Sequence, residues 1–159
     1  MRRCWAPRGE RPIVGHQIVR EFVYAVGAVC PTDGQLVSLI MPWVDAEVMS
    51  IFLATAAQEC SHDHCFMFLD AAAWHTAHDL RVPANMTLFF LPPYSPELNP
   101  MEHVWDHLRE NSFGNRTCAS LTEVENILCD GLLMLHKNPA SVSSLTCFDW
   151  LNTLPLMSN

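Results

Sequence analysis

Two short, almost wholly apolar runs place the tightest limits on how this chain can fold. The first covers residues 65–69 and the second covers residues 86–91. Runs of this length without a polar face are typical of strands buried on both sides, as in the parallel sheets of α/β proteins. The first run ends at Asp70 and the second at Pro92-Pro93, so both end sharply. We therefore predict two buried strands, each with polar or turn residues at its carboxyl end.

A β-hairpin is expected ahead of these two strands. Residues 18–30 are rich in β-branched and aromatic side chains, which predicts a strand. Pro-Thr-Asp-Gly at 31–34 is a turn sequence, and residues 35–41 predict the returning strand.

Helices are expected from capping residues and from the spacing of apolar side chains. Asp45 fits the N-cap of a helix over 46–59, and residues 71–80 predict a short helix. Asn99 followed by Pro100 predicts a further helix start, and Ser120 opens a capping box before a last helix. The helix after Asn99 would direct four apolar side chains to the core: Met101, Val104, Trp105 and Leu108.

The resulting order is hairpin, helix, strand, helix, strand, helix, helix. This order predicts a mixed α/β fold in which helices cover a sheet that is partly antiparallel and partly parallel. With 159 residues, of which 50% are hydrophobic and 16% charged, the chain has room for one domain with a sizeable core.

The charge balance disfavours a free-standing nucleic-acid-binding domain. Nine Lys and Arg face 17 Asp and Glu, which gives a formal charge of -8, whereas contacts to phosphates need cations. The one basic cluster lies in residues 1–17, which we predict to be an irregular basic arm. Its arginines either touch a DNA backbone or form a solvated tail; they are Arg2, Arg3, Arg8 and Arg11.

The sequence contains no targeting or membrane signal. Its start is arginine-rich and lacks the apolar segment of a signal peptide. The longest apolar stretches, such as 22–30, are about half of what a bilayer span needs. Seven cysteines, an odd number without a C-x-x-C pair, favour a reduced, cytoplasmic protein. The cluster of Cys and His within residues 60–65 closes tetrahedral zinc geometry poorly, so a solvated loop is expected there.

Two carboxylates occupy positions suited to chemistry. Asp70 follows a buried strand, at the edge where α/β proteins form clefts. Glu102 lies in the first turn of the helix that follows the second buried strand. Acids brought together from such positions can bind divalent cations for phosphoryl transfer. The structural alternatives are that Asp70 caps the helix after it and that Glu102 closes a capping box on Asn99.

Residues 91–105, LPPYSPELNPMEHVW, resemble the signature of bacterial insertion-sequence transposases related to the Tc/mariner group. These enzymes belong to the DDE superfamily and have a ribonuclease H-like fold. The resemblance covers nearly the whole chain. Its other matching segments are 5–12 (WAPRGERP), 69–75 (LDAAAWH), 108–111, 115–116 and the closing Asp149-Trp150.

The resemblance implies a ribonuclease H-like three-layer fold, with a mixed sheet flanked by helices, and a function in DNA transposition. Asp70 would be the second acid of the catalytic triad and Glu102 the third, with 31 residues between them. Both would be ligands of Mg²⁺ or Mn²⁺, and His75 would be an auxiliary that steers a metal ligand or a phosphate. A partly exposed helix histidine without such a role is the alternative for His75. The implied reaction is metal-dependent DNA strand cleavage and transfer at transposon ends.

The sequence departs from the family pattern in three ways. No acidic residue precedes Trp5, where the first triad acid would lie on its strand, and the helix-turn-helix region that reads the transposon ends is missing. Ala71 stands where the family usually has Asn. Residues 18–159 are therefore expected to be an N-terminally truncated DDE catalytic domain that holds metal weakly. It would act as a homodimer or with an N-terminal fragment. The alternative is a non-catalytic remnant or interaction module that pairs with an N-terminal transposase fragment.

Overall fold

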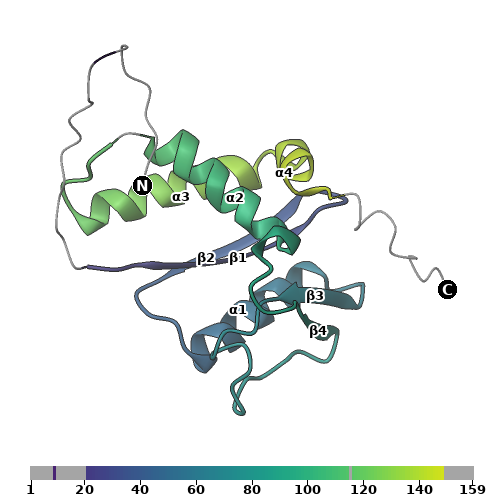
Figure 1. Ribbon diagram of the computed structural model, residues 1–159. Helices are drawn as coiled ribbons and strands as arrows, with labels where there is room; N and C mark the ends of the chain where they lie inside the picture. The colour runs from purple at the N-terminus through teal and green to yellow at the C-terminus, as the bar shows by residue number, and fades with distance from the viewer. Residues whose placement is uncertain (1–8, 10–20, 115, 149–159) are drawn as a thin grey trace.

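The structure, a computed structural model, describes residues 9, 21–114 and 116–148 (Figure 1). Apart from Gly9, the predicted arm at 1–17 lies outside these residues, as does Asp149-Trp150. The strands are β1 (Tyr24–Cys30), β2 (Gln35–Met41), β3 (Cys65–Leu69) and β4 (Met86–Phe90). The α-helices are α1 (Ala46–Glu59), α2 (Pro100–Leu108), α3 (Leu121–His136) and α4 (Pro139–Thr146). A 3₁₀ turn, Pro96–Leu98, precedes α2, and a π-helical turn, Arg109–Phe113, extends it.

The strands form two pairs. β1 and β2 are antiparallel, with Gly27 opposite Ser38, and β3 and β4 are parallel, with Leu69 opposite Phe90. The predicted mixture of antiparallel and parallel strands in an α/β protein is thus confirmed. Among the described residues, however, the two pairs are not hydrogen-bonded to each other, so they do not form the single sheet that was expected.

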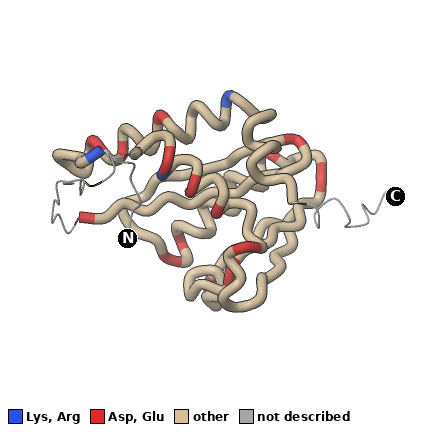
Figure 2. The backbone as a smooth tube through the Cα atoms, turned by 45° about the horizontal axis from the view of Figure 1, so that its top comes forward, with Lys and Arg blue, Asp and Glu red and all other residues tan. Residues whose placement is uncertain are grey.

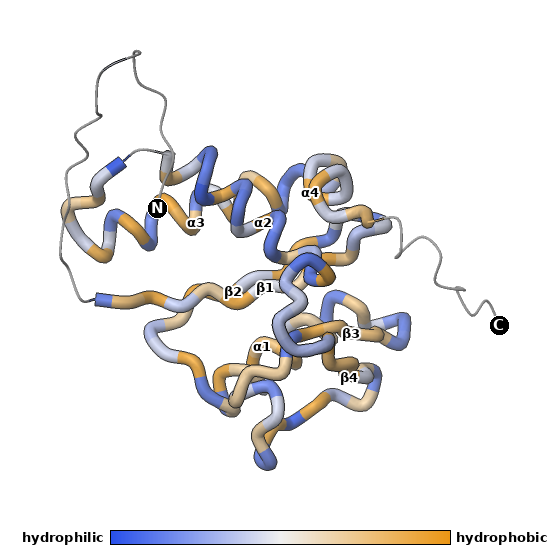
Figure 3. The backbone as a smooth tube through the Cα atoms, viewed as in Figure 1, coloured by the Kyte–Doolittle hydropathy of each residue, from blue (hydrophilic) through white to orange (hydrophobic). Residues whose placement is uncertain are grey.

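The β1–β2 hairpin lies between helix α1 on one face and three helices on the other, because its side chains alternate between two apolar faces. Side chains of Val26, Ala28, Val37 and Leu39 pack with α1, which also covers β3 and β4. On the other face, the hairpin packs with α2, α3 and α4. Figure 3 shows that β3 is hydrophobic along its length. The prediction that β3 and β4 are buried on both faces is wrong, because one face of the pair is open: Phe66 is 59% and Phe89 is 43% exposed.

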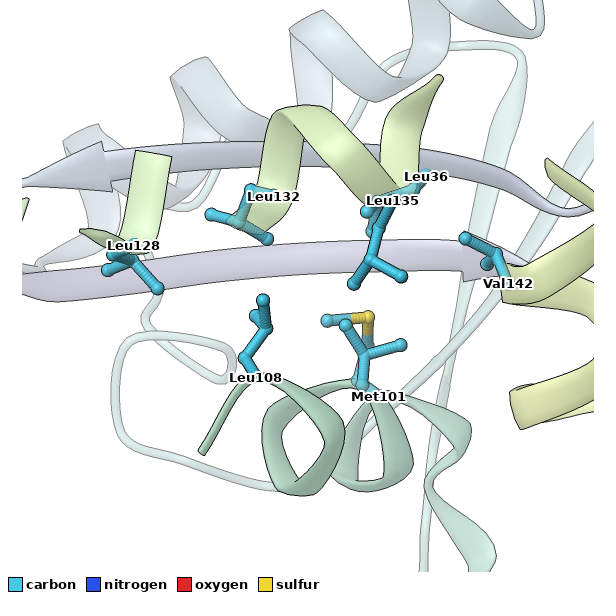
Figure 4. Close-up of a cluster of buried hydrophobic side chains, with 8 residues drawn as sticks. Leu36, Met101, Leu108, Leu128, Leu132, Leu135 and Val142 are labelled. Carbon is cyan, nitrogen blue, oxygen red and sulfur yellow. The ribbon is translucent and has the colours of Figure 1, made fainter. Parts of the chain in front are cut away.

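The core on the α2 side joins elements that are distant in the sequence (Figure 4). Val104, Leu108, Leu36, Leu135 and Val142 are each no more than 2% exposed. Burial of such side chains contributes about 1.5–3 kcal/mol each. The predicted core-facing residues of α2 are confirmed, with Trp105 packed partly buried against this cluster.

The predicted helix starts are confirmed by their hydrogen bonds. Asp45 Oδ1 accepts from the Val48 amide at 2.8 Å, and Asn99 Oδ1 accepts from the Met101 amide at 3.1 Å. Ser120 Oγ accepts from the amide of the Glu at the third helical position, at 3.2 Å. These side chains satisfy amide groups that a helix leaves unpaired at its amino end.

The observed elements differ from the predictions at one strand boundary and in two helices. The first strand begins at Tyr24, and residues 21–23 before it are not in a strand. The helix predicted over 71–80 is wrong, because this segment forms isolated turns. The Asp70 carboxylate accepts from the Ala72 amide at 3.1 Å, and such local side-chain bonds compete with a helix. Helix α4 was not predicted, since its sequence PASVSSLT has weak helix propensity.

Gly34 ends the hairpin turn and lies directly beneath the start of α4. Its φ of +76° favours glycine, and an added Cβ would lie 1.9 Å from the Pro139 carbonyl oxygen.

We predict that Gly34→Ala lowers the free energy of unfolding by at least about 2 kcal/mol, measured by urea denaturation. Gly9→Ala is the control, because Gly9 has φ +99° with no neighbour within 4 Å and should lose no more than about 1 kcal/mol. Equal losses in both variants would contradict the packing of the turn against α4.

Candidate functional site

Asp70 lies at the carboxyl edge of the parallel strand pair. It directly follows β3, and the Leu91 amide donates to the Leu69 carbonyl at 2.8 Å, so the two chains remain paired up to this edge. The Asp70 side chain is 66% exposed. Its Oδ1 accepts from the Ala72 amide, which holds the carboxylate in a tight turn instead of capping the predicted helix.

His75 contacts Asp70 directly. Its Nδ1 lies 2.8 Å from the Asp70 carbonyl oxygen and 2.8 Å from Asp70 Oδ1. The His75 side chain is only 14% exposed, and its ring meets the Trp74 ring edge-on at 6.0 Å. The ring is therefore fixed on both sides. The turns at 72–76 bring it back toward Asp70, in place of the helical turn that was expected.

Glu102 lies in the first turn of α2 and is partly buried. Its amide donates to the Asn99 carbonyl at 3.0 Å, but its carboxylate forms no hydrogen bond or ion pair with another described residue. The Asn99 amide already donates to the Pro96 carbonyl at 3.0 Å. The alternative in which Glu102 closes a capping box on Asn99 is therefore not what this helix uses.

The structure thus brings two of the three predicted site residues into contact, namely Asp70 and His75. No hydrogen bond or ion pair within the described ranges joins either of them to Glu102. The elements that carry the two acids are linked through β4, which pairs with β3, and the segment 91–99 leads from the carboxyl end of β4 to the start of α2 (Figure 1). The described ranges hold no group of three or more His, Cys, Asp or Glu arranged to bind a metal ion.

An open groove of about 510 Å³ lies beside His75. One wall comes from residues 75–82 and the other from β4. Phe90, which is 48% exposed and opposite Leu69 in the strand register, lines it close to the Asp70 edge. The groove therefore includes His75, the residue in contact with Asp70, and the end of β4.

Tyr94 was missed in the reasoning from sequence. Its side chain is fully exposed and its φ is +60°. The motif in residues 91–105 contains it, but nothing in the spacing of that motif marks the residue as exposed or its backbone as unusual.

Residues of the cysteine and histidine cluster at 60–65 interact with each other and with β4. Burial and the neighbouring Cys60 thiol raise the pKa of Cys65 to about 12, so this thiol stays protonated at neutral pH. His64 Nε2 lies 2.8 Å from the Thr87 hydroxyl, which ties the start of β3 to β4. On α2, His103 Nδ1 contacts the Leu145 carbonyl at 2.9 Å and so links α2 to α4.

Lys and Arg residues are sparse along the described backbone (Figure 2). Arg81, Arg109, Arg116 and Lys137 are the Lys and Arg residues of these ranges, and Arg109 pairs with Asp106. The other five of the nine lie within residues 1–20.

Comparison with known proteins places the chain in a family. Residues 1–125 match the family of the DDE superfamily endonuclease. The chain belongs to this family. It is also 37% identical over 130 residues to the uncharacterized protein y4pE/y4sA of Sinorhizobium fredii (strain NBRC 101917 / NGR234), an alignment that covers 81% of this chain and 96% of that protein. No solved structure matches.

The membership agrees with the α/β architecture described above, and with a transposase-like nuclease. None of the described helices of this DDE endonuclease chain combines the length and apolar character that crossing a membrane requires.

Proposed function

We propose that this chain is the catalytic domain of a DDE transposase with a ribonuclease H-like fold, which cleaves and joins DNA strands at the ends of an insertion sequence. The membership in the DDE superfamily endonuclease family supports a nuclease, and DNA is the expected substrate. The observation that carries the residue assignment is the position of Asp70 at the carboxyl edge of β3–β4, with His75 bound to it.

Asp70 and Glu102 are the proposed ligands of Mg²⁺ or Mn²⁺. Carboxylate oxygens are hard donors that suit these ions, and Mg²⁺ usually takes one or two protein carboxylates while water and substrate phosphates complete its shell. Asp70 is largely exposed, and the Glu102 carboxylate forms no hydrogen bond or ion pair within the described residues. Both carboxylates thus have lone pairs to offer. When bound, the metal would activate the attacking oxygen and stabilise the leaving oxygen of a phosphodiester.

His75 is the proposed positioning residue for Asp70. With its proton on Nδ1, the ring donates to the Asp70 carboxylate and carbonyl, both at 2.8 Å. This leaves Oδ2 of Asp70 as the oxygen directed to a ligand, and it restricts rotation of the carboxylate. Hydrogen bonds to a residue that binds a metal raise its affinity for the metal, because they fix the orientation of its side chain.

We predict that Asp70→Asn removes the metal-dependent activity of the full chain. The amide keeps the size of the side chain but loses the negative charge that a divalent ion requires. Titration calorimetry with Mn²⁺ should show weak binding to the unmodified protein and none to Asp70→Asn, and cleavage of DNA in Mg²⁺ should fall by at least about 100-fold. Asp130→Asn, an exposed change on α3, is the matched control and should behave like the unmodified chain. Equal metal binding by Asp70→Asn and the unmodified chain would contradict the assignment.

We predict a smaller effect for His75. His75→Ala should lower metal affinity and cleavage about 10- to 100-fold, because Asp70 loses the group that orients it. His75→Asn should restore part of the loss, since its amide can donate close to the position of Nδ1. His78→Ala changes an exposed histidine of the same segment and should have no effect. If His75→Ala and His78→Ala both matched the unmodified protein, the positioning role would be refuted.

A second proposal is that the chain acts as an interaction module that accepts a strand from elsewhere, such as an N-terminal transposase fragment. The observation that favours it is the separation of the two strand pairs, which share α1 without hydrogen bonds between them in the described ranges. Unpaired strand edges invite the addition of a further strand.

The Mn²⁺ titration and the DNA cleavage assay described above also separate the two proposals. A strand inserted between the pairs could bring the first acid of the triad that the family resemblance implies, and the chain would then cleave DNA only with its partner. A pure interaction module would bind no Mn²⁺ with or without that partner.

A further inference from the structure

Tyr94 combines two unusual features, a fully exposed aromatic side chain and a left-handed backbone. Its side chain is fully exposed, and neither its ring nor its hydroxyl contacts another described residue. Its φ of +60° is found at no other non-glycine residue in the described ranges. A bulky residue in this region of φ is uncommon, and the strain persists where the surrounding structure imposes it, often at functional sites.

The surrounding chain holds Tyr94 in place beside the proposed catalytic edge. Leu91 is hydrogen-bonded to Leu69, the residue before Asp70, and three residues span at most about 11 Å. Tyr94 therefore lies within about 11 Å of Leu91, at the carboxyl edge of the β3–β4 pair. Pro93 precedes it, and the 3₁₀ turn Pro96–Leu98 follows it, with the Leu98 amide bonded to the Ser95 carbonyl at 3.1 Å.

The charge distribution explains why an aromatic side chain would matter here. A DNA-processing surface usually gains affinity from Lys and Arg, but the described part of this chain offers few of them (Figure 2). Stacking of a base on an aromatic ring needs no cation and tolerates any base sequence, because every base has a π-face. An exposed tyrosine at this edge supplies such a ring.

We propose that Tyr94 stacks on an unpaired base of the DNA next to the phosphodiester that reacts. The inference rests on the proposed function in taking DNA as the ligand, but not on the metal site. Stacking uses the ring face, so the hydroxyl is dispensable. The left-handed backbone would present the ring outward from the loop.

The test measures binding of the full-length chain to a duplex that contains a short unpaired stretch with 2-aminopurine, whose fluorescence falls when it stacks. Divalent metal is left out, so that no cleavage occurs. Tyr94→Phe should match the unmodified chain, whereas Tyr94→Leu should lose the quenching and bind about 5-fold to 150-fold more weakly. Tyr24→Leu, which changes the other tyrosine of the chain, is the control and should match the unmodified protein.

A second variant guards against loss of folding. Tyr94→Gly should raise the melting temperature by about 2–4 °C, because the left-handed backbone suits glycine, and still bind the probe as weakly as Tyr94→Leu. The proposal is overturned if Tyr94→Leu quenches and binds like the unmodified chain, or if the unmodified chain does not bind the probe. Tyr94-dependent quenching in a chain that fails to cleave the same DNA in Mg²⁺ would support this inference and count against the proposed reaction.

Discussion

The close packing of α2 on β1 is the constraint on which the proposed site depends. Gly27 allows the closest approach, since a Cβ there would lie 2.6 Å from Cε at the flexible end of Met101 and 3.3 Å from the Trp105 ring. Met101 is buried in the core that joins α2 to α3, α4 and the hairpin. Because Glu102 is the next residue, the contact that seats the helix also fixes the proposed metal ligand. Asp70 is held separately, by the end of β3 and by His75.

The net charge of -8 agrees with this arrangement better than with autonomous DNA binding. Acidic side chains are needed at a metal-dependent nuclease site, whereas five of the nine basic residues lie within positions 1–20 of the sequence. A DDE endonuclease of this kind would rely on other contacts to hold DNA at the site. Exposed aromatic side chains at the carboxyl edge of the strands, including Phe90 and Tyr94, are the contacts that the fold offers there.

Much of the fold could be predicted from the sequence where local and tertiary preferences agree. The apolar run at β3 and the caps Asp45, Asn99 and Ser120 each determine an element through nearby atoms. The segment 71–80 could not be predicted, because hydrogen bonds of the Asp70 side chain and the His75 ring stabilise turns in place of a helix. Helix α4 depends on burial of Val142 in the core, a tertiary effect that its own sequence does not reveal. Asp70 after β3 and Glu102 in the first turn of α2 lie in the elements that the sequence predicts for them, but the exposure of Tyr94 depends on backbone geometry that spacing does not encode.

The most direct test of the central claim is a crystal structure of the full chain soaked in Mn²⁺, with anomalous differences recorded at a wavelength where manganese scatters. We expect a peak in contact with carboxylate oxygens of both Asp70 and Glu102, with oxygen–metal distances near 2.1–2.2 Å, slightly longer than for Mg²⁺. A structure in which Mn²⁺ binds elsewhere, while the two carboxylates lie too far apart to share an ion, would contradict the claim that they form the metal centre.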